Sequence, residues 1–215
     1  MVTHYIHRGL AKKSFKENTL SAFKYSFKKR YGIETDLQVT KDNQLICFHD
    51  FNLRRRFNLN KNVKDINYSI LKKISKKKKA TVPLLKDLLK ISKNKYPLLL
   101  EIKPLLTKIS LLNLIKLIKK TKKYGIISFK EKNLINLYKI NKKLSLGLLF
   151  LSTASFKNIK IKSKKKYVKF LVLEKKFLSN KNLHLIRKKI YYYTIKNKNL
   201  FKKYRYTKNL IFEKI

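Results

Sequence analysis

Hydrophobic residues follow two alternating patterns along the 215 residues of the chain. Short apolar runs predict strands, and lysine-rich segments with apolar residues every three or four positions predict helices. This alternation is typical of βα units around a parallel sheet. The expected strands are residues 2–6, 33–39, 45–48, 98–102, 125–129, 145–150, 168–173, 190–194 and 210–212. The expected helices are residues 18–29, 110–122, 131–142, 180–188 and 197–204.

Nine strands are one more than a (β/α)8 barrel needs. Residues 41–43 separate two of them and are too few for a crossover helix, so they predict a hairpin turn. One of the two flanking strands is therefore expected to be antiparallel and additional to the barrel. We expect the α/β class, with a (β/α)8 TIM barrel and a small insertion lobe after the second βα region.

The lobe is expected at about residues 54–95, because this segment fits no simple βα unit. Two short helices are predicted there, near residues 66–74 and 84–91, on either side of the lysine run 76–79. That run is interpreted as a solvated loop. The length and the apolar content of 44% suit one domain over residues 1–215.

The low cysteine count and the absence of long apolar runs bear on the cellular compartment. Cys47 is the single cysteine, which excludes an internal disulfide framework. No apolar run approaches the ~18 residues of a transmembrane helix, and the first residues do not form a secretory signal. We therefore expect a soluble, cytoplasmic protein.

The formal net charge of +45 is unusual and permits two interpretations. A basic surface suits nucleic acid or a membrane surface, because it neutralises phosphates. Alternatively, the chain is rich in Lys, Asn, Ile, Tyr and Phe, all with AT-rich codons, so drift in genome base composition accounts for the lysines. Lysine is spread along the whole chain and no nucleic-acid motif is present. We expect no specific nucleic-acid partner and a weak attraction to anionic membrane surfaces.

The eleven acidic residues are scarce, so their positions are informative. Glu34 and Asp36 stand two apart in an expected strand, which places both carboxylates on one face. Glu101 lies at the end of another strand, where barrel enzymes collect active-site residues. Converging carboxylates are neutralised either by lysine or by a hard cation that prefers oxygen ligands. The residues alone leave both possibilities open.

Two histidines also stand at expected strand ends. His7 is followed by Arg8, and His49 is followed by Asp50. Histidine titrates near neutrality and suits general acid–base catalysis, whereas arginine can hold a phosphate through its planar fork of donors. A lone histidine at a strand end is more often structural, but two with charged neighbours leave a catalytic and a structural role equally open.

These residues fall within an ordered series of short motifs. The motifs are His7-Arg8-Gly9, Glu17-Asn18-Thr19-Leu20, Glu34-Thr35-Asp36-Leu37-Gln38-Val39, His49-Asp50, Val82-Pro83-Leu84-Leu85 and Glu101-Ile102-Lys103. In this series the chain resembles the glycerophosphodiester phosphodiesterase family, and the specific part of the resemblance ends near residue 103.

The resemblance implies a TIM-barrel hydrolase that cleaves glycerophosphodiesters to an alcohol and sn-glycerol 3-phosphate. It implies a divalent metal, Ca²⁺ or Mg²⁺, and a lobe that partly covers the pocket. It also implies roles for individual residues: metal ligation by Glu34, Asp36 and Glu101, acid–base catalysis by His7 and His49, phosphate binding by Arg8 and Lys103, and support of the site by Glu17, Asn18 and Asp50.

The late part of the chain departs from the family pattern. Tyr193 stands where the family usually has tryptophan, and residues 212–215 lack the usual Thr-Asp or Thr-Asn pair followed by proline. We expect the last βα unit to be altered. Two alternative functions stay open: a phospholipase D-like enzyme acting on lysophospholipids, which needs an apolar channel, and a non-enzymatic basic protein that binds nucleic acid or membrane surfaces. The oligomeric state is not predicted.

Overall fold

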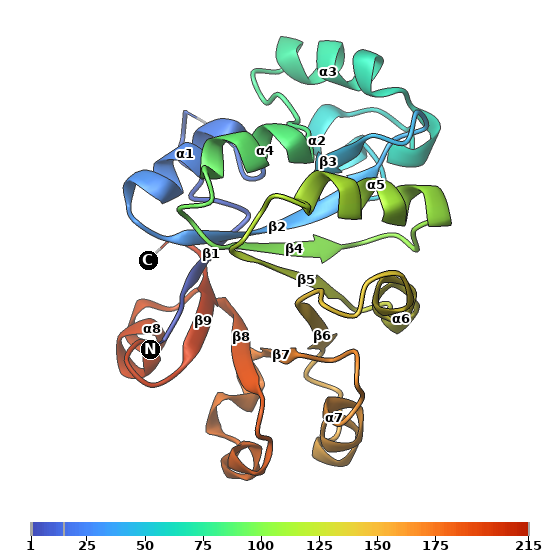
Figure 1. Ribbon diagram of the computed structural model, residues 1–215. Coiled ribbons are helices and arrows are strands. Elements are labelled where there is room, and N and C mark those ends of the chain that lie inside the picture. The colour runs from blue at the N-terminus through green and yellow to red at the C-terminus, as the bar shows by residue number, and fades with distance from the viewer. Residues whose placement is uncertain (1, 15, 215) are drawn as a thin grey trace.

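A computed structural model describes residues 2–14 and 16–214. In it, eight parallel strands form a closed barrel, because β1 pairs with β2 on one side and with β9 on the other. Figure 1 shows the strands around a common centre, with helices outside them. The barrel strands are β1 (Tyr5–His7), β2 (Gly32–Val39), β4 (Leu98–Ile102), β5 (Tyr124–Ser128), β6 (Leu146–Phe150), β7 (Phe170–Glu174), β8 (Lys189–Ile195) and β9 (Asn209–Phe212). The predicted fold class is confirmed.

The extra strand lies where the sequence predicts it. β3 (Leu45–Cys47) pairs antiparallel with β2, outside the closed barrel. Between the two strands, the backbone N–H of Asn43 donates to the carbonyl of Thr40 at 2.9 Å. Asn43 has a φ of 55°, a left-handed conformation that asparagine tolerates. The chain therefore reverses within a few residues.

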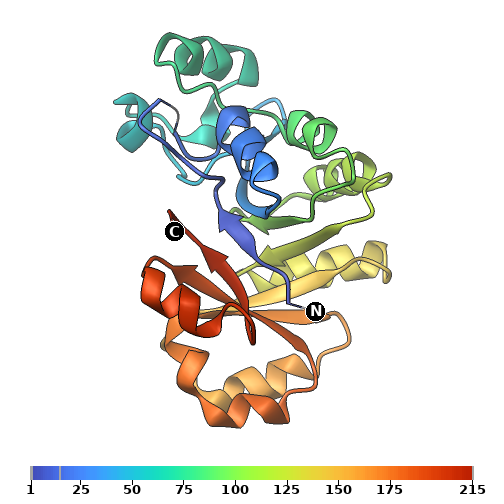
Figure 2. The same ribbon diagram turned by 90° about the vertical axis from the view of Figure 1, so that its left-hand side faces the viewer.

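Helices follow most strands and cover the outside of the barrel (Figures 1 and 2). At several N-caps, a side chain accepts a hydrogen bond from a backbone N–H group that has no partner within the first turn of the helix. Thr19, for example, accepts from the N–H of Ala22. No helix in the described part of the chain is long and apolar enough to cross a membrane. The α-helices of the barrel are α1 (Leu20–Lys28), α4 (Leu85–Ser92), α5 (Lys108–Ile118), α6 (Glu131–Ile140), α7 (Phe156–Ser163) and α8 (Lys198–Tyr204).

Two helical segments differ from the sequence-based expectation. α7 was not expected, because only Ile159 and Ser163 of its eight residues are buried and its amphipathic pattern is weak. The helix expected over residues 180–188 is wrong. A short 3-10 helix, η3 (Lys181–Leu185), takes its place and follows another, η2 (Lys175–Ser179). The Asn180 side chain accepts from the N–H of Asn182, which favours a local turn over a continuous helix.

A small lobe lies beside the barrel and has its own apolar cluster. It contains α2 (Arg54–Phe57), η1 (Val63–Asp65) and α3 (Tyr68–Lys77). Phe48, Leu71 and Val82 are fully buried in the cluster. The expected lobe of residues 54–95 extends too far, because Leu85 and Leu88 of α4 pack in the barrel core instead. We infer one domain whose lobe covers about residues 45–84.

The core of the barrel has an inner and an outer layer, separated by the alternation of each strand. On β4, Leu98 and Leu100 pack outward under the helices, whereas Leu99 packs inside the barrel. Phe170 fills part of the interior, and a Cβ added at Gly147 would overlap its ring. Glu101 shares the inward parity of Leu99. The same alternation on β2 turns its two acidic residues toward the interior.

Candidate active site

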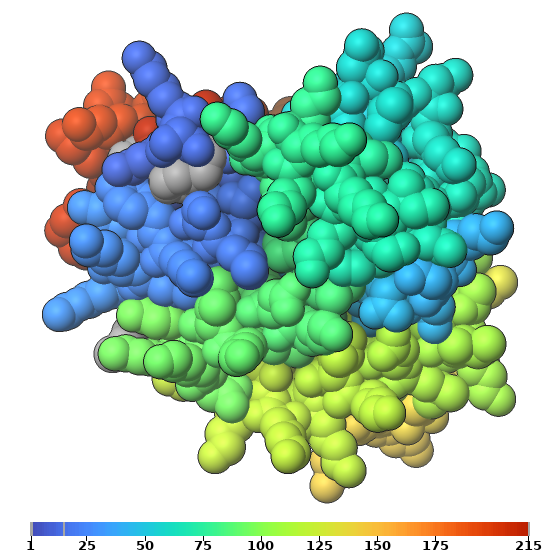
Figure 3. Space-filling view, turned by 90° about the horizontal axis from the view of Figure 1, so that it is seen from above, coloured from blue at the N-terminus to red at the C-terminus, as the bar shows by residue number. Residues whose placement is uncertain are grey.

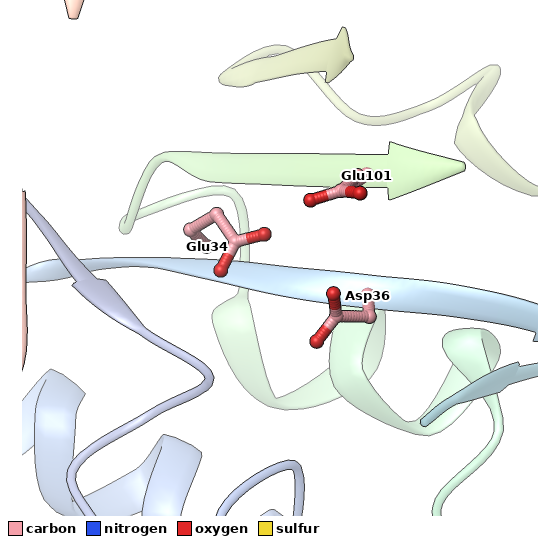
Figure 4. A group of neighbouring side chains, drawn as sticks. All are labelled: Glu34, Asp36 and Glu101. Carbon is pink, nitrogen blue, oxygen red and sulfur yellow. The ribbon is translucent and has the colours of Figure 1, made fainter. Parts of the chain in front are cut away.

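Three carboxylates from β2 and β4 meet inside the barrel (Figure 4). Glu34 and Asp36 share one face of β2, and Asp36 stands opposite Glu101 in the register of the two strands. One oxygen from each carboxylate lies within 4.8 Å of the others. All three residues are buried. The convergence inferred from strand alternation is therefore present.

The charges of this cluster are not balanced internally. Burial, together with the nearby carboxylates of Asp36 and Glu101, raises the pKa of Glu34 to about 8. Burial and the Asp36 charge likewise raise the pKa of Glu101. Asp36 differs: burial raises its pKa, but the charges of Arg8, His49, Lys103 and His7 together outweigh burial and hold the pKa below the ordinary value. The cluster thus favours a protonated Glu34 beside an ionised Asp36.

Two cations neutralise part of the cluster. The Nε of Arg8 lies 3.0 Å from Asp36 Oδ2, and the Nζ of Lys103 lies 2.9 Å from Glu101 Oε1. Two buried oxygens, Glu34 Oε1 and Asp36 Oδ1, have no hydrogen-bond partner within residues 2–14 and 16–214. Buried polar atoms are rarely left unpaired. Asp36 Oδ1 lies 3.6 Å from the Nζ of Lys103, beyond hydrogen-bond distance. Carboxylate oxygens that lack hydrogen-bond donors and are grouped in this way suit a hard divalent cation, and these three residues could hold one.

Asn18 and the turn after β1 support the acidic cluster. The amide of Asn18 donates to Asp36 Oδ2 at 3.0 Å and accepts from the Thr35 hydroxyl at 2.7 Å. Arg8, Gly9 and Asn18 all have positive φ values, of 54°, 72° and 50°. A side chain at Gly9 would also meet Phe23 at 2.8 Å. This turn brings the Arg8 guanidinium over the carboxylates.

His7 ends β1 between two carboxylates. Its Nδ1 lies 2.6 Å from Glu213 Oε1, and its Nε2 lies 3.7 Å from Glu34 Oε2. Burial lowers the pKa of His7, but the Glu34 charge and the Glu213 hydrogen bond outweigh burial and raise it. Glu213 directly follows β9, which pairs with β1, so strand pairing brings it to His7. The contact with Glu213 fixes the ring and directs Nε2 toward the acidic cluster.

His49 is held by a chain of ion pairs that links the lobe to the barrel. Its Nδ1 lies 2.7 Å from Asp50 Oδ1, and Asp50 Oδ2 accepts from Arg55 at 2.6 Å. Arg55, on α2 of the lobe, also donates to Glu17 at 2.9 Å. Glu17 lies 3.4 Å from the Arg8 guanidinium. His49 contributes to the lowered pKa of Asp36, so its ring lies within electrostatic reach of the cluster.

A cavity of about 750 Å³ opens beside His7, between the N-terminal turn and the lobe. Glu17 and Glu213 line it close to His7, and Lys78 and Ala80 line it on the lobe side. Figure 3 shows the N-terminal segment (blue) on this face, with the lobe (cyan) and the green residues after it alongside. The cavity gives a ligand access to His7.

The structure brings together the residues that the sequence singled out. Three of them form the acidic cluster. Four contact it directly, namely His7, Arg8, Asn18 and Lys103. Glu17 contacts Arg8, and His49 and Asp50 join through Arg55. Sequence reasoning missed Glu213 and Arg55. The position of Glu213 directly after the last expected strand was the available signal for it. Nothing local in the sequence marks Arg55 out from its two arginine neighbours.

The glycerophosphoryl diester phosphodiesterase family model matches residues 7–187. The chain belongs to this family. A glycerophosphodiester phosphodiesterase of Bacillus altitudinis is 35% identical over 99 residues, which are 42% of this chain and 40% of that protein. Human lysophospholipase D GDPD1 is 39% identical over 66 residues, 30% of this chain and 21% of that protein. The matched segments thus span less than half of either relative.

A solved structure agrees with the fold over nearly the whole length. An Oleispira antarctica phosphodiesterase, solved in complex with the product sn-glycerol-3-phosphate, superposes with a TM-score of 0.82 at 18% identity. The superposition covers 98% of this chain and 92% of that one. At this identity the match concerns the fold. The family resemblance and the TIM-barrel fold expected from the sequence are confirmed.

Proposed function

We propose that this protein hydrolyses glycerophosphodiesters to an alcohol and sn-glycerol 3-phosphate, with Ca²⁺ or Mg²⁺ bound to Glu34, Asp36 and Glu101. The observation that carries the proposal is the buried acidic cluster next to a histidine that faces an accessible cavity. Family membership and the product named for the Oleispira enzyme support the reaction type. A bound divalent ion would polarise a phosphoryl oxygen and offset the charge of the diester.

The chain's own residues would move the protons and hold the phosphate. His7 and His49 form the acid–base pair: one takes a proton from the nucleophile, either water or the glycerol 2-hydroxyl, and the other protonates the leaving alkoxide. Arg8 and Lys103 contribute donors to the phosphate. Glu17, Asn18 and Asp50 position these groups through the contacts described above. In the overall reaction, the phosphorus–oxygen bond to the alcohol is replaced by one to water oxygen.

The alternative functions fit the cavity less well. A lysophospholipid needs an apolar channel, whereas the cavity is lined mainly by charged side chains. A pure binding protein does not need a buried acidic cluster that contains carboxylate oxygens without hydrogen-bond partners. A cytoplasmic location and a weak attraction to anionic membranes stay predictions from the sequence.

The test is release of glycerol 3-phosphate from glycerophosphocholine and glycerophosphoethanolamine, with calcium, magnesium or EDTA. Wild type is compared with Glu34→Ala, His49→Ala and His184→Ala; the last is a matched control, because His184 is exposed on η3. We expect metal-dependent release that the first two substitutions abolish and the third leaves unchanged. Folded protein that releases nothing from any diester with any metal would refute the proposal.

A further inference from the structure

The cavity beside His7 is strongly basic beyond the groups needed for one phosphodiester. Seven lysine and arginine residues line it, against two acidic residues. Both acids already have partners, since Glu17 pairs with Arg8 and Arg55, and Glu213 pairs with His7 and Lys196. The remaining cations lack a carboxylate partner within the described residues; they include Lys13, Lys16, Lys78 and Arg56.

Among these residues, Arg56 has buried guanidinium atoms without hydrogen-bond partners in residues 2–14 and 16–214. Its guanidinium lies over the rings of Phe48 and Phe57, at 5.6 and 5.9 Å from their centroids. Its Nε and Nη2 are buried and have no hydrogen-bond partner in the described part of the chain. Burial lowers the pKa of Arg56 to about 10. Burying guanidinium donors without an acceptor is costly. Arg56 also lines the cavity, so an anion bound at this edge would bring negative charge close to the guanidinium.

The lysine-rich composition does not account for this arrangement. Codon drift favours lysine, and it explains why lysines occur on every surface of a chain with 56 basic residues. It does not explain a half-buried arginine without an acidic partner at the cavity wall. The feature is therefore local to the cavity.

The lining also argues against a cationic headgroup. Quaternary ammonium groups are recognised by aromatic faces. No Phe, Tyr or Trp is among the residues that line this cavity within 2–14 and 16–214. A choline or ethanolamine group would instead face the lysines of the rim, where like charges repel.

We propose that the cavity receives a second anionic group carried by the leaving alcohol, so that the substrates are glycerophosphodiesters whose headgroup itself bears a phosphate ester. This inference rests on the proposed function and specifies its substrate class. The reacting phosphate lies at the acidic cluster and His7, and the second phosphate lies toward Arg56 and Lys78. Water adds to the first phosphorus, the bond to the headgroup oxygen breaks, and that oxygen takes a proton. The second ester is unchanged.

The experiment compares two diesters that differ in the charge of the headgroup. One is 1,3-bis(sn-glycero-3-phospho)glycerol, whose first hydrolysis yields sn-glycerol 3-phosphate and glycerophosphoglycerol. The other is glycerophosphocholine. We expect kcat/KM to be at least about tenfold higher for the bis-phosphate, since several partly screened charge contacts favour it.

Matched variants distinguish the effect of the cavity's charges from the effect of the net charge of the whole protein. Lys13→Gln/Lys16→Gln/Lys78→Gln removes three charges from the rim, and we expect the ratio of the two kcat/KM values to fall about tenfold. Lys116→Gln/Lys119→Gln/Lys120→Gln removes the same charge from exposed positions at the end of α5. The chain after α5 reaches the start of β4, because the Leu98 N–H donates to the carbonyl of Lys123. These lysines therefore lie at the opposite end of the barrel from the site. The control should keep the wild-type ratio.

Each outcome decides one question. Glycerophosphocholine hydrolysed as fast as the bis-phosphate, or faster, would overturn the substrate class and leave the proposed function standing. Equal losses of the ratio in both triple variants would also overturn it, because general attraction would then be the cause. Hydrolysis of neither diester with any metal would refute the proposed function itself. Arg56→Gln, where it folds, should lower the ratio in the same direction as the rim variant.

Discussion

The acidic cluster should cost the metal-free protein stability, and Glu34→Gln should recover it. In the folded chain the pKa of Glu34 is about 8, against an ordinary value of 4.5. At pH 7 the folded protein retains a proton that the unfolded chain releases. Because pH 7 lies ~2.5 units above the pKa of Glu34 in the unfolded chain, holding this proton costs the folded protein about 3 kcal/mol of stability. Glutamine has the same shape, is neutral at every pH, and can still accept from the Arg8 N–H, which lies 3.4 Å from Glu34 Oε2.

The pH dependence follows from the sign of the shift. A carboxyl whose pKa is raised on folding destabilises the protein increasingly as pH rises from the unfolded to the folded pKa. The advantage of Glu34→Gln should therefore be near zero at pH 4.5, about 3 kcal/mol at pH 7, and about 5 kcal/mol above pH 8.

The assay is urea unfolding in EDTA at pH 5, 7 and 8.5. For a chain of this length, 3 kcal/mol corresponds to a rise in Tm of roughly 6–12 °C. Glu131→Gln is the control, because Lys162 and the Tyr167 hydroxyl lower the pKa of Glu131 against its partial burial. Its substitution should be destabilising at pH 7, the opposite sign. A Glu34→Gln protein no more stable than wild type at pH 7, with no change in the difference at pH 8.5, would refute the reasoning.

Three further predictions concern the ion, the histidine and the lobe. Metal binding at pH 7 should release about one proton from Glu34, which calorimetry in buffers of different ionisation enthalpy would detect; binding without proton release would contradict the protonated state. Glu213→Gln should lower kcat about 10- to 100-fold with little change in KM. The variant keeps an acceptor for His7 but loses the negative charge that favours the protonated ring. An unchanged kcat would exclude this role for Glu213. Leu71→Ala should cost roughly 2–5 kcal/mol in urea unfolding, since Leu71 is fully buried in the lobe, whereas Ile70→Ala, at a half-exposed position, should cost under about 0.5 kcal/mol.

The acidic cluster was predictable from sequence because its causes are local. Alternation within β2 fixes the common face of Glu34 and Asp36. Glu101 ends a neighbouring barrel strand, and all parallel strands present their carboxyl ends on one side. A short turn between two strands likewise required β3 to be antiparallel. Such inferences need no knowledge of which distant segments meet.

The missed features depend on distant contacts or on weak patterns. Glu213 and His7 are 206 residues apart, and closure of the barrel by β9 brings them together. Arg55 reaches Glu17 across 38 residues because the lobe folds back over the turn after β1. The boundary of the lobe was misplaced because α4 has an apolar face that fits either core, and its packing in the barrel decides the matter. α7 escaped detection because only two of its eight residues are buried, which leaves its amphipathic pattern weak.

The excess of lysine and the scarcity of acid act together at this site. Of the eleven acidic residues, six belong to the cluster or to the ion pairs around it, namely Glu17, Glu34, Asp36, Asp50, Glu101 and Glu213. The other five acidic residues stand against 56 basic residues, so the field of the protein raises the local concentration of anions and draws them toward the molecule. Under the proposed function, this field would bring the anionic diester to the protein. The buried carboxylates at one end of the barrel would hold the cation that determines where the diester reacts.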